Sequence, residues 1–97
     1  MSVALGQVVI SRAGRDAKRK FVVVKVIDEL YVELSDGDLR RIEKPKRKKV
    51  KHLHITSEII EDLGEKLGNN MKITNAEIRK ALAEVDTLKN MGDIKLN

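Results

Sequence analysis

Apolar β-branched residues alternate with polar ones along the first part of the chain, a pattern that predicts short strands. Residues 31–35 alternate in this way, whereas residues 5–13 and 21–27 are runs rich in β-branched residues. Val and Ile pack well on a pleated sheet and lose side-chain freedom in a helix, so residues 21–27, which include four valines, predict the clearest strand. Gly14 and the Asp-Gly pair at 36–37 interrupt the pattern and are typical of turns. The first half of the sequence therefore predicts an antiparallel sheet.

Two more short strands would complete this sheet. Residues 39–43 can form a fourth strand, which Pro45 would end or confine to a sheet edge because proline has no amide hydrogen. Residues 44–51 are a basic tract, and residues 52–55 can form a last strand. We therefore expect one β domain of about five strands over residues 1–55.

After residue 55 the apolar period changes from two to about 3.6, which predicts two amphipathic helices. Thr56 or Ser57 can cap the first helix, and Gly68 followed by asparagine can end it. Its inward face would carry Ile59, Ile60, Leu63 and Leu67. The Thr-Asn-Ala-Glu segment at 74–77 is typical of a capping box, after which one face would carry Ile78, Ala81, Leu82, Val85 and Leu88. Residues 56–97 are thus expected to be a helical extension whose two helices cover the sheet, pair with each other or dock on a partner.

Composition limits the class of protein. The chain has 97 residues, enough for one modest core, and only Phe21 and Tyr31 are aromatic. Cysteine is absent, which excludes disulfides, thiolate metal sites and cysteine nucleophiles and fits a reducing compartment. The sequence also has no basic leader before an apolar run and no apolar stretch of the length that crosses a membrane. We therefore expect a cytoplasmic protein with no membrane partner.

Positive charge is concentrated in the first half of the chain. Residues 1–54 contain 14 Lys and Arg against 7 Asp and Glu, a net charge of +7, whereas residues 55–97 have a net charge of −2. The cations form two clusters. The first surrounds Asp16 in the turn between the first two strands and consists of Arg12, Arg15, Lys18, Arg19 and Lys20. The second precedes His52 and consists of Arg40, Arg41, Lys44, Lys46, Arg47, Lys48, Lys49 and Lys51. Such runs recur as phosphate-binding tracts, so they favour a nucleic-acid partner over a flexible solvated linker.

No constellation typical of catalysis is present in the sequence. His52 and His54 lie two positions apart on one predicted strand face and could form a metal pair, but no cysteine or carboxylate cluster completes a site. Beside a lysine tract these imidazoles are better explained by RNA contact or partial burial. The acidic residues at 58–65 fit a solvated helical face, and no phosphate-cradling or dinucleotide fingerprint exists. We therefore expect no enzyme activity, no metal and no cofactor.

Several short motifs resemble the KOW motif, a strand-loop-strand unit of ribosomal and transcription-elongation proteins. They are Leu-Gly-Gln-Val-Val at 5–9, Gly-Arg-Asp at 14–16 and Phe-Val-Val-Val at 21–24. The resemblance continues through residues 26–28 and 35–37 and covers about half the chain. Over this part the sequence is similar to the archaeal and eukaryotic type of large-subunit ribosomal protein fourteen and to its small bacterial relatives.

This resemblance implies a small SH3-like antiparallel barrel whose KOW loop touches ribosomal RNA. The motif's structural residues would be Gly6, Gly14, Asp16, Asp36 and Gly37, of which Gly14 corresponds to the characteristic glycine. The sequence departs from the family pattern at Ala17, where such loops commonly carry a second glycine.

Two functions remain open on the sequence. The favoured one is binding of structured RNA, ribosomal RNA by the resemblance, through phosphate contacts and shape. With two aromatic residues, a base-stacking platform is disfavoured, and Tyr31 is the only plausible stacker. The alternative is a protein-interaction module that uses the barrel and the amphipathic helices to bind a ribosomal or other protein. DNA binding is weaker because no groove-reading helix is predicted.

Overall fold

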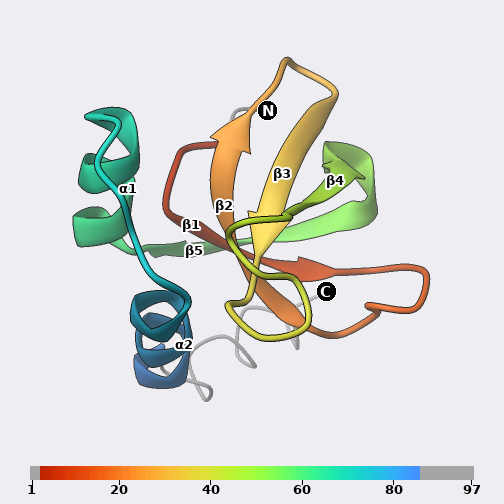
Figure 1. Ribbon diagram of the computed structural model, residues 1–97. Coiled ribbons are helices and arrows are strands. Elements are labelled where there is room, and N and C mark those ends of the chain that lie inside the picture. The colour runs from red at the N-terminus through yellow and green to blue at the C-terminus, as the bar shows by residue number, and fades with distance from the viewer. Residues whose placement is uncertain (1–2, 86–97) are drawn as a thin grey trace.

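A computed structural model describes residues 3–85, which form a mainly β fold with two helices after the strands (Figure 1). The strands are β1 (Gln7–Ser11), β2 (Lys20–Val26), β3 (Tyr31–Ser35), β4 (Lys46–Lys49) and β5 (Leu53–Ile59). A 3-10 turn, η1 (Val50–His52), joins β4 to β5. The helices are α1 (Glu61–Gly68) and α2 (Asn75–Glu84). The expected class, an antiparallel sheet followed by two helices, is therefore confirmed.

All five strands belong to one antiparallel sheet in the order β4-β3-β2-β1-β5. The two edge strands follow each other in the chain and are separated only by η1, so the sheet must curl to bring those edges together at that turn. Register shifts between Gln7 and Val9 and between Val23 and Lys25 mark irregularities that bend β1 and β2.

Alternation along β1 and β2 divides the core into two clusters, one on each face of the sheet. One cluster consists of Val9, Phe21, Val23, Val32, Leu34 and Leu53. The other joins sheet residues to helix residues and consists of Val8, Val22, Val24, Leu63, Ile73, Ile78, Leu82 and Val85. Each fully buried apolar side chain stabilises the fold by roughly 1.5–3 kcal/mol. Sheet and helices therefore share a hydrophobic core.

The predicted start of the second helix is confirmed. The Glu77 backbone N–H donates to Thr74 Oγ1 at 3.1 Å, and the Thr74 N–H donates to Glu77 Oε2 at 2.7 Å, which completes the capping box. Lys66 Nζ on α1 donates to Glu77 Oε1 at 2.8 Å. This hydrogen bond lowers the pKa of the Glu77 carboxyl below its ordinary value and raises the pKa of the Lys66 ammonium. Leu88, which was predicted to continue the apolar face, lies outside the described residues.

The predicted end of the first helix is also confirmed. Asn70 has a φ of 57°, the left-handed conformation that asparagine tolerates. Its N–H donates to the Leu67 carbonyl at 3.1 Å, and the Met71 N–H donates to the Lys66 carbonyl at 2.8 Å. These two bonds satisfy carbonyls that would otherwise lack partners at the helix end.

The predicted start of the first helix was wrong. Strand β5 continues through residues 56–59, and α1 begins at Glu61 after Ile60, which caps it without a side-chain hydrogen bond. Thr56 is buried in the strand, where its Oγ1 donates to the Val8 carbonyl at 2.7 Å instead of capping a helix. Ile59 was predicted to face inward and is exposed on the strand.

The predicted fourth strand was also misplaced. Residues 39–43 lie in the loop between β3 and β4, and the basic tract itself supplies the strand, with Tyr31 opposite Lys49 and Leu34 opposite Lys46. Lysine has little β propensity, but β3 offers a free edge to pair with, and long lysine stems can cover apolar surface. His52 belongs to η1 and not to the last strand.

Candidate nucleic-acid interface

The loop between β1 and β2 is tightly folded and has two residues in the left-handed region. Gly14 has a φ of 80° and Lys18 a φ of 69°. The Lys18 N–H donates to the Ser11 carbonyl at 2.7 Å and closes the loop. A side chain at Gly14 would meet only Lys48 Nζ, at 3.6 Å, so glycine is needed there for its conformation and not for space. The second residue of the loop with a positive φ is Lys18. It follows Ala17, the position at which loops of the KOW family commonly carry a second glycine.

Two ion pairs connect this loop to the loop between β3 and β4. Arg19 Nη2 lies 3.2 Å from Asp36 Oδ2, and Arg40 Nη2 lies 3.0 Å from Asp16 Oδ2. Asp16 and Asp36 are only 6% and 7% exposed. Asp36 Oδ1 also accepts the N–H groups of Asp38 and Arg40, both at 2.9 Å. Arg19 and Arg40, both predicted to bind RNA, therefore hold the two loops together, with their charge balanced by buried carboxylates.

Helix α2 also contacts the β3–β4 loop, through Asn75 and Arg79. Arg79 Nη1 donates to the Gly37 carbonyl at 2.6 Å, and Asn75 Oδ1 accepts the Ile42 N–H at 2.8 Å. Asn75 Nδ2 donates to Glu43 Oε2 at 2.7 Å. Gly37 has a φ of 74°, and a side chain there would collide with the Asn75 carbonyl. The roles of Asn75 and Arg79 could not be identified from the sequence, because their partners are more than 30 positions away along the chain.

Strand β4 distributes its cations over both faces of the sheet. Arg47 and Lys49 share a face with Tyr31, and the Arg47 Cζ and Lys49 Nζ atoms lie 4.5 and 5.9 Å from the centre of its ring. Lys46 and Lys48 lie on the other face, where their register positions oppose Leu34 and Val32. Lys48 Nζ reaches the β1–β2 loop and donates to the Ala13 carbonyl at 3.2 Å. The two cation clusters of the sequence thus meet in space.

A hollow of about 550 Å³, here called the Tyr31 hollow, lies where β1, β4, η1 and the β2–β3 hairpin come together. Three cations line it with Tyr31, one from each of β4, η1 and the residue that follows β1: Lys49, Lys51 and Arg12. Glu29 and apolar side chains, Leu30 among them, complete the lining. Backbone hydrogen bonds fix this corner, because the Arg12 N–H donates to the His52 carbonyl at 2.9 Å and the Val50 N–H donates to the Leu30 carbonyl at 2.8 Å.

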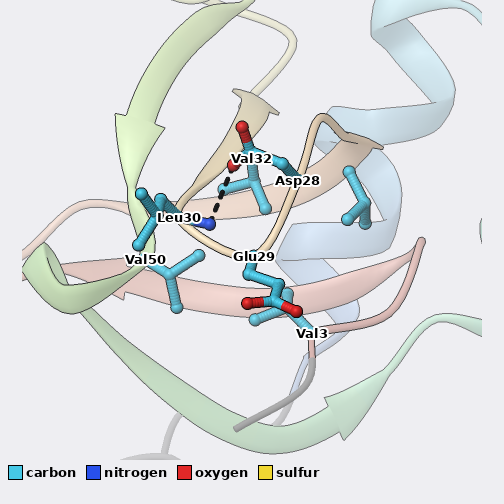
Figure 2. Close-up of a pocket in the computed structure, with 7 residues that line it drawn as sticks. Val3, Asp28, Glu29, Leu30, Val32 and Val50 are labelled. Atoms are coloured by element: carbon cyan, nitrogen blue, oxygen red, sulfur yellow. Dashed lines mark hydrogen bonds between the residues drawn. The ribbon is translucent and has the colours of Figure 1, made fainter.

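A second hollow, of about 900 Å³, shares Glu29, Leu30 and Val50 with the first (Figure 2). Its walls are mostly apolar, with Asp28 and Glu29 as its charged residues. Asp28 Oδ1 accepts the Leu30 N–H at 2.8 Å, the bond drawn in Figure 2, and the Tyr31 N–H at 2.9 Å. Leu30 lines both hollows and is 66% exposed. No cation lines this second hollow, which we call the hairpin hollow.

The remaining predicted residues are more dispersed. Arg15 and Lys18 are exposed on the β1–β2 loop, and their side chains have no ion pair among the described residues. Lys20 lies beside Arg19 at the start of β2, and Arg41 pairs with Glu43 at 3.4 Å. Lys44 is exposed in the β3–β4 loop, and His52 is exposed in η1. We define the basic surface as the lysines and arginines of the β1–β2 loop, β4 and η1 that are not in ion pairs, together with the exposed His52: Arg12, Arg15, Lys18, Lys46, Arg47, Lys48, Lys49, Lys51 and His52.

The histidines do not gather other metal ligands. His52 lies in η1 and His54 lies opposite Ile10 in β5, where His54 Nε2 is buried with no hydrogen-bond partner among the described residues. Within residues 3–85, no three His, Cys, Asp or Glu side chains form a group that could hold a metal ion. Neither helix in this range has the length and apolar character needed to cross a membrane.

Comparison with known families does not assign the chain. The sequence matches no protein-family model. The arrangement of cations around the Tyr31 hollow is therefore the observation from which a function can be argued.

Proposed function

We propose that the protein is a non-catalytic RNA-binding protein built on an SH3-like KOW barrel, and that ribosomal RNA is its partner. Consecutive edge strands joined by a short 3-10 turn support a small closed barrel, as does the reach of Lys48 to the β1–β2 loop. The positive φ of Gly14 supports a KOW loop, because the motif's glycine is expected to adopt such a conformation.

The observation that carries the proposal is the gathering of cations from β4, η1 and the β1–β2 loop in one region of the molecule. In Figure 1, β4 and the β1–β2 loop lie on the right, away from α1 and α2 on the left. Cations from separate segments converge there without carboxylates to balance most of them, and like charges so placed repel one another unless a polyanion neutralises them. Phosphate contacts supply most of the affinity of such a surface and make it depend on salt.

The test measures how affinity depends on salt when matched charges are removed. One variant carries Lys49→Gln and Lys51→Gln on the basic surface, and the control carries Lys72→Gln and Lys80→Gln in the helical part. All four lysines are exposed. Each lost phosphate contact reduces the slope of log affinity against log salt by roughly 0.7–0.9, so the first variant should lose about 1.5 of slope and the control none. Fluorescence anisotropy with a labelled ribosomal RNA fragment and a random competitor provides the isotherms.

The second candidate is a protein-interaction module, and the hairpin hollow is the observation that favours it. The apolar faces of α1 and α2 are occupied by the core, whereas Leu30 projects beside an apolar hollow. Chromatography on immobilised RNA, with and without nuclease, separates the two candidates. Retention that is independent of salt, together with purified protein free of nucleic acid, would favour the interaction module over RNA binding.

A further inference from the structure

The Tyr31 hollow has features that phosphate binding alone does not explain. Cations at its edge suit phosphates, but Leu30, Val50 and Leu53 give it apolar walls, against which a phosphate would lose its hydration without compensation. Its volume of about 550 Å³ lies within the range of pockets that hold small organic groups, roughly 300–1,000 Å³. A ligand that matches both features has a flat, weakly polar part and an anionic part.

We propose that the Tyr31 hollow binds one unstacked base of the RNA, with the flanking phosphates on Arg12 and Lys51; this inference rests on the proposed RNA binding. RNA is commonly recognised by bases splayed out onto aromatic side chains. The net positive charge of the hollow's lining favours this ligand over an apolar peptide, because three cations and one acid line the hollow.

The backbone of Tyr31 is held in place at the edge of the hollow. Its N–H donates to Asp28 Oδ1, and its strand pairs it with Lys49. Arg47 lies against the ring, at 4.5 Å from its centre, but does not line the hollow, so the ring contacts Arg47 and also borders the hollow. A base entering the hollow would extend this cation–ring contact into a stack and would order few additional side chains.

Glu29 gives the site a preference among bases. It is the only acid that lines the hollow, and a carboxylate accepts hydrogen bonds but donates none. Cytosine presents an exocyclic amino group that can donate to it, whereas uracil presents a carbonyl at the same position. We therefore expect cytosine to bind more tightly than uracil, with the phosphates held away from Glu29 on the side of the cations.

The experiment uses the fluorescence of Tyr31, which is the only tyrosine in a chain without tryptophan. The probes are a cytidine hexamer, a uridine hexamer and inorganic polyphosphate, which has charge but no base. The cytidine hexamer should quench the tyrosine emission more than the uridine hexamer, and polyphosphate should not quench it. Glu29→Gln should abolish the difference between the two hexamers, since an amide can donate to the uracil carbonyl.

Two variants separate stacking from charge and from folding. Both variants lack the tyrosine signal, so their binding is measured by the fluorescence anisotropy of a labelled cytidine hexamer. Tyr31→Leu keeps apolar volume but has no ring face, and it should weaken binding of the cytidine hexamer roughly 5- to 150-fold, the usual loss for one stacked base. Tyr31→Phe should bind within about threefold of the parent, because it keeps the ring. Both variants should retain the parent's salt slope, because no cation is removed.

The outcomes distinguish this site from the proposed function. If Tyr31→Leu binds the hexamer like the parent while structured RNA still binds in a salt-dependent manner, the hollow holds no base and RNA binding stands. Equal quenching by polyphosphate would also overturn the base site, because it would show a site for anions alone. If neither the hexamers nor structured RNA bind with salt dependence, the proposed function fails and the inference fails with it.

Discussion

Removing the two arginines that pair with buried carboxylates should affect stability and not RNA binding. The variant carries Arg19→Gln and Arg40→Gln, the same loss of two positive charges as Lys49→Gln with Lys51→Gln. In the parent, Arg40 donates the only side-chain hydrogen bond that the Asp16 carboxylate accepts among the described residues. Asp36 would keep its two backbone donors but would lose its cation.

The expected loss of stability can be worked from these contacts. A hydrogen bond to a charged group is worth roughly 1.5–3 kcal/mol, but the Arg19 and Arg40 side chains are 40% and 34% exposed, so water replaces part of each contact. We therefore expect about 1–2 kcal/mol for each pair and about 2–4 kcal/mol for both. For a domain of this size, each kcal/mol lowers the melting temperature by roughly 4–8 °C, so the fall should be on the order of 10–30 °C.

Two measurements on the same protein check the prediction. Thermal unfolding followed by circular dichroism gives the stability, and anisotropy titrations well below the melting temperature give the salt slope. The Arg19/Arg40 variant should unfold early with an unchanged slope, whereas the Lys49/Lys51 variant should keep its stability and lose about 1.5 of slope. A variant lacking both arginines that melts like the parent and loses slope would refute the assignment of these residues to the loop contact.

Three smaller predictions concern the loops and the helix pair. Gly37→Ala should lower the melting temperature more than Gly14→Ala in thermal unfolding, because both glycines have positive φ but only the new Cβ at Gly37 would collide with backbone; equal effects would contradict this. Lys18→Gly should raise the free energy of unfolding by roughly 0.5–1 kcal/mol in urea titrations, since glycine adopts its left-handed conformation freely. The lowered pKa of Glu77 means that its contribution is present above its ordinary pKa of 4.5 and is lost as the pH falls through the folded-state pKa. Glu77→Gln should therefore be less stable than the parent at pH 7 and approach it as the pH falls below 4.5 in acid unfolding; a constant difference would exclude the Lys66 contact as its cause.

Local signals in the sequence predicted those elements whose cause is local. Thr74 and Glu77 lie three positions apart and satisfy each other's backbone, so the start of α2 could be found without knowledge of the fold. Strand β2 could be found because it contains a run of β-branched residues, of which Val22, Val23 and Val24 are buried. Residues 46–49 could not be predicted as a strand, because their conformation depends on pairing with β3 and not on their own propensity. Thr56 was read as a helix cap, because nothing near it in the sequence shows that its hydroxyl bonds to Val8.

The candidate site was predicted as a set of cations but not as an arrangement. The sequence indicated which residues carry charge, and the structure separates those balanced by carboxylates from those that are not. Arg19 pairs across 17 positions and Arg40 across 24, distances along the chain that no motif spacing reveals. Tyr31 was singled out as a possible stacker, but its position beside Arg47 and Lys49 follows from the unexpected pairing of β3 with β4.

The shared core of sheet and helices has a consequence for how the chain folds during synthesis. The five strands leave the translating ribosome before α1 and α2, so one face of the nascent sheet, with Val8, Val22 and Val24, has no cover at that stage. Uncovered apolar surface of this kind promotes aggregation and attracts chaperones. Stable folding must wait until Ile78 and Leu82 have been synthesised, and a fragment that stops after β5 should remain unfolded or self-associate.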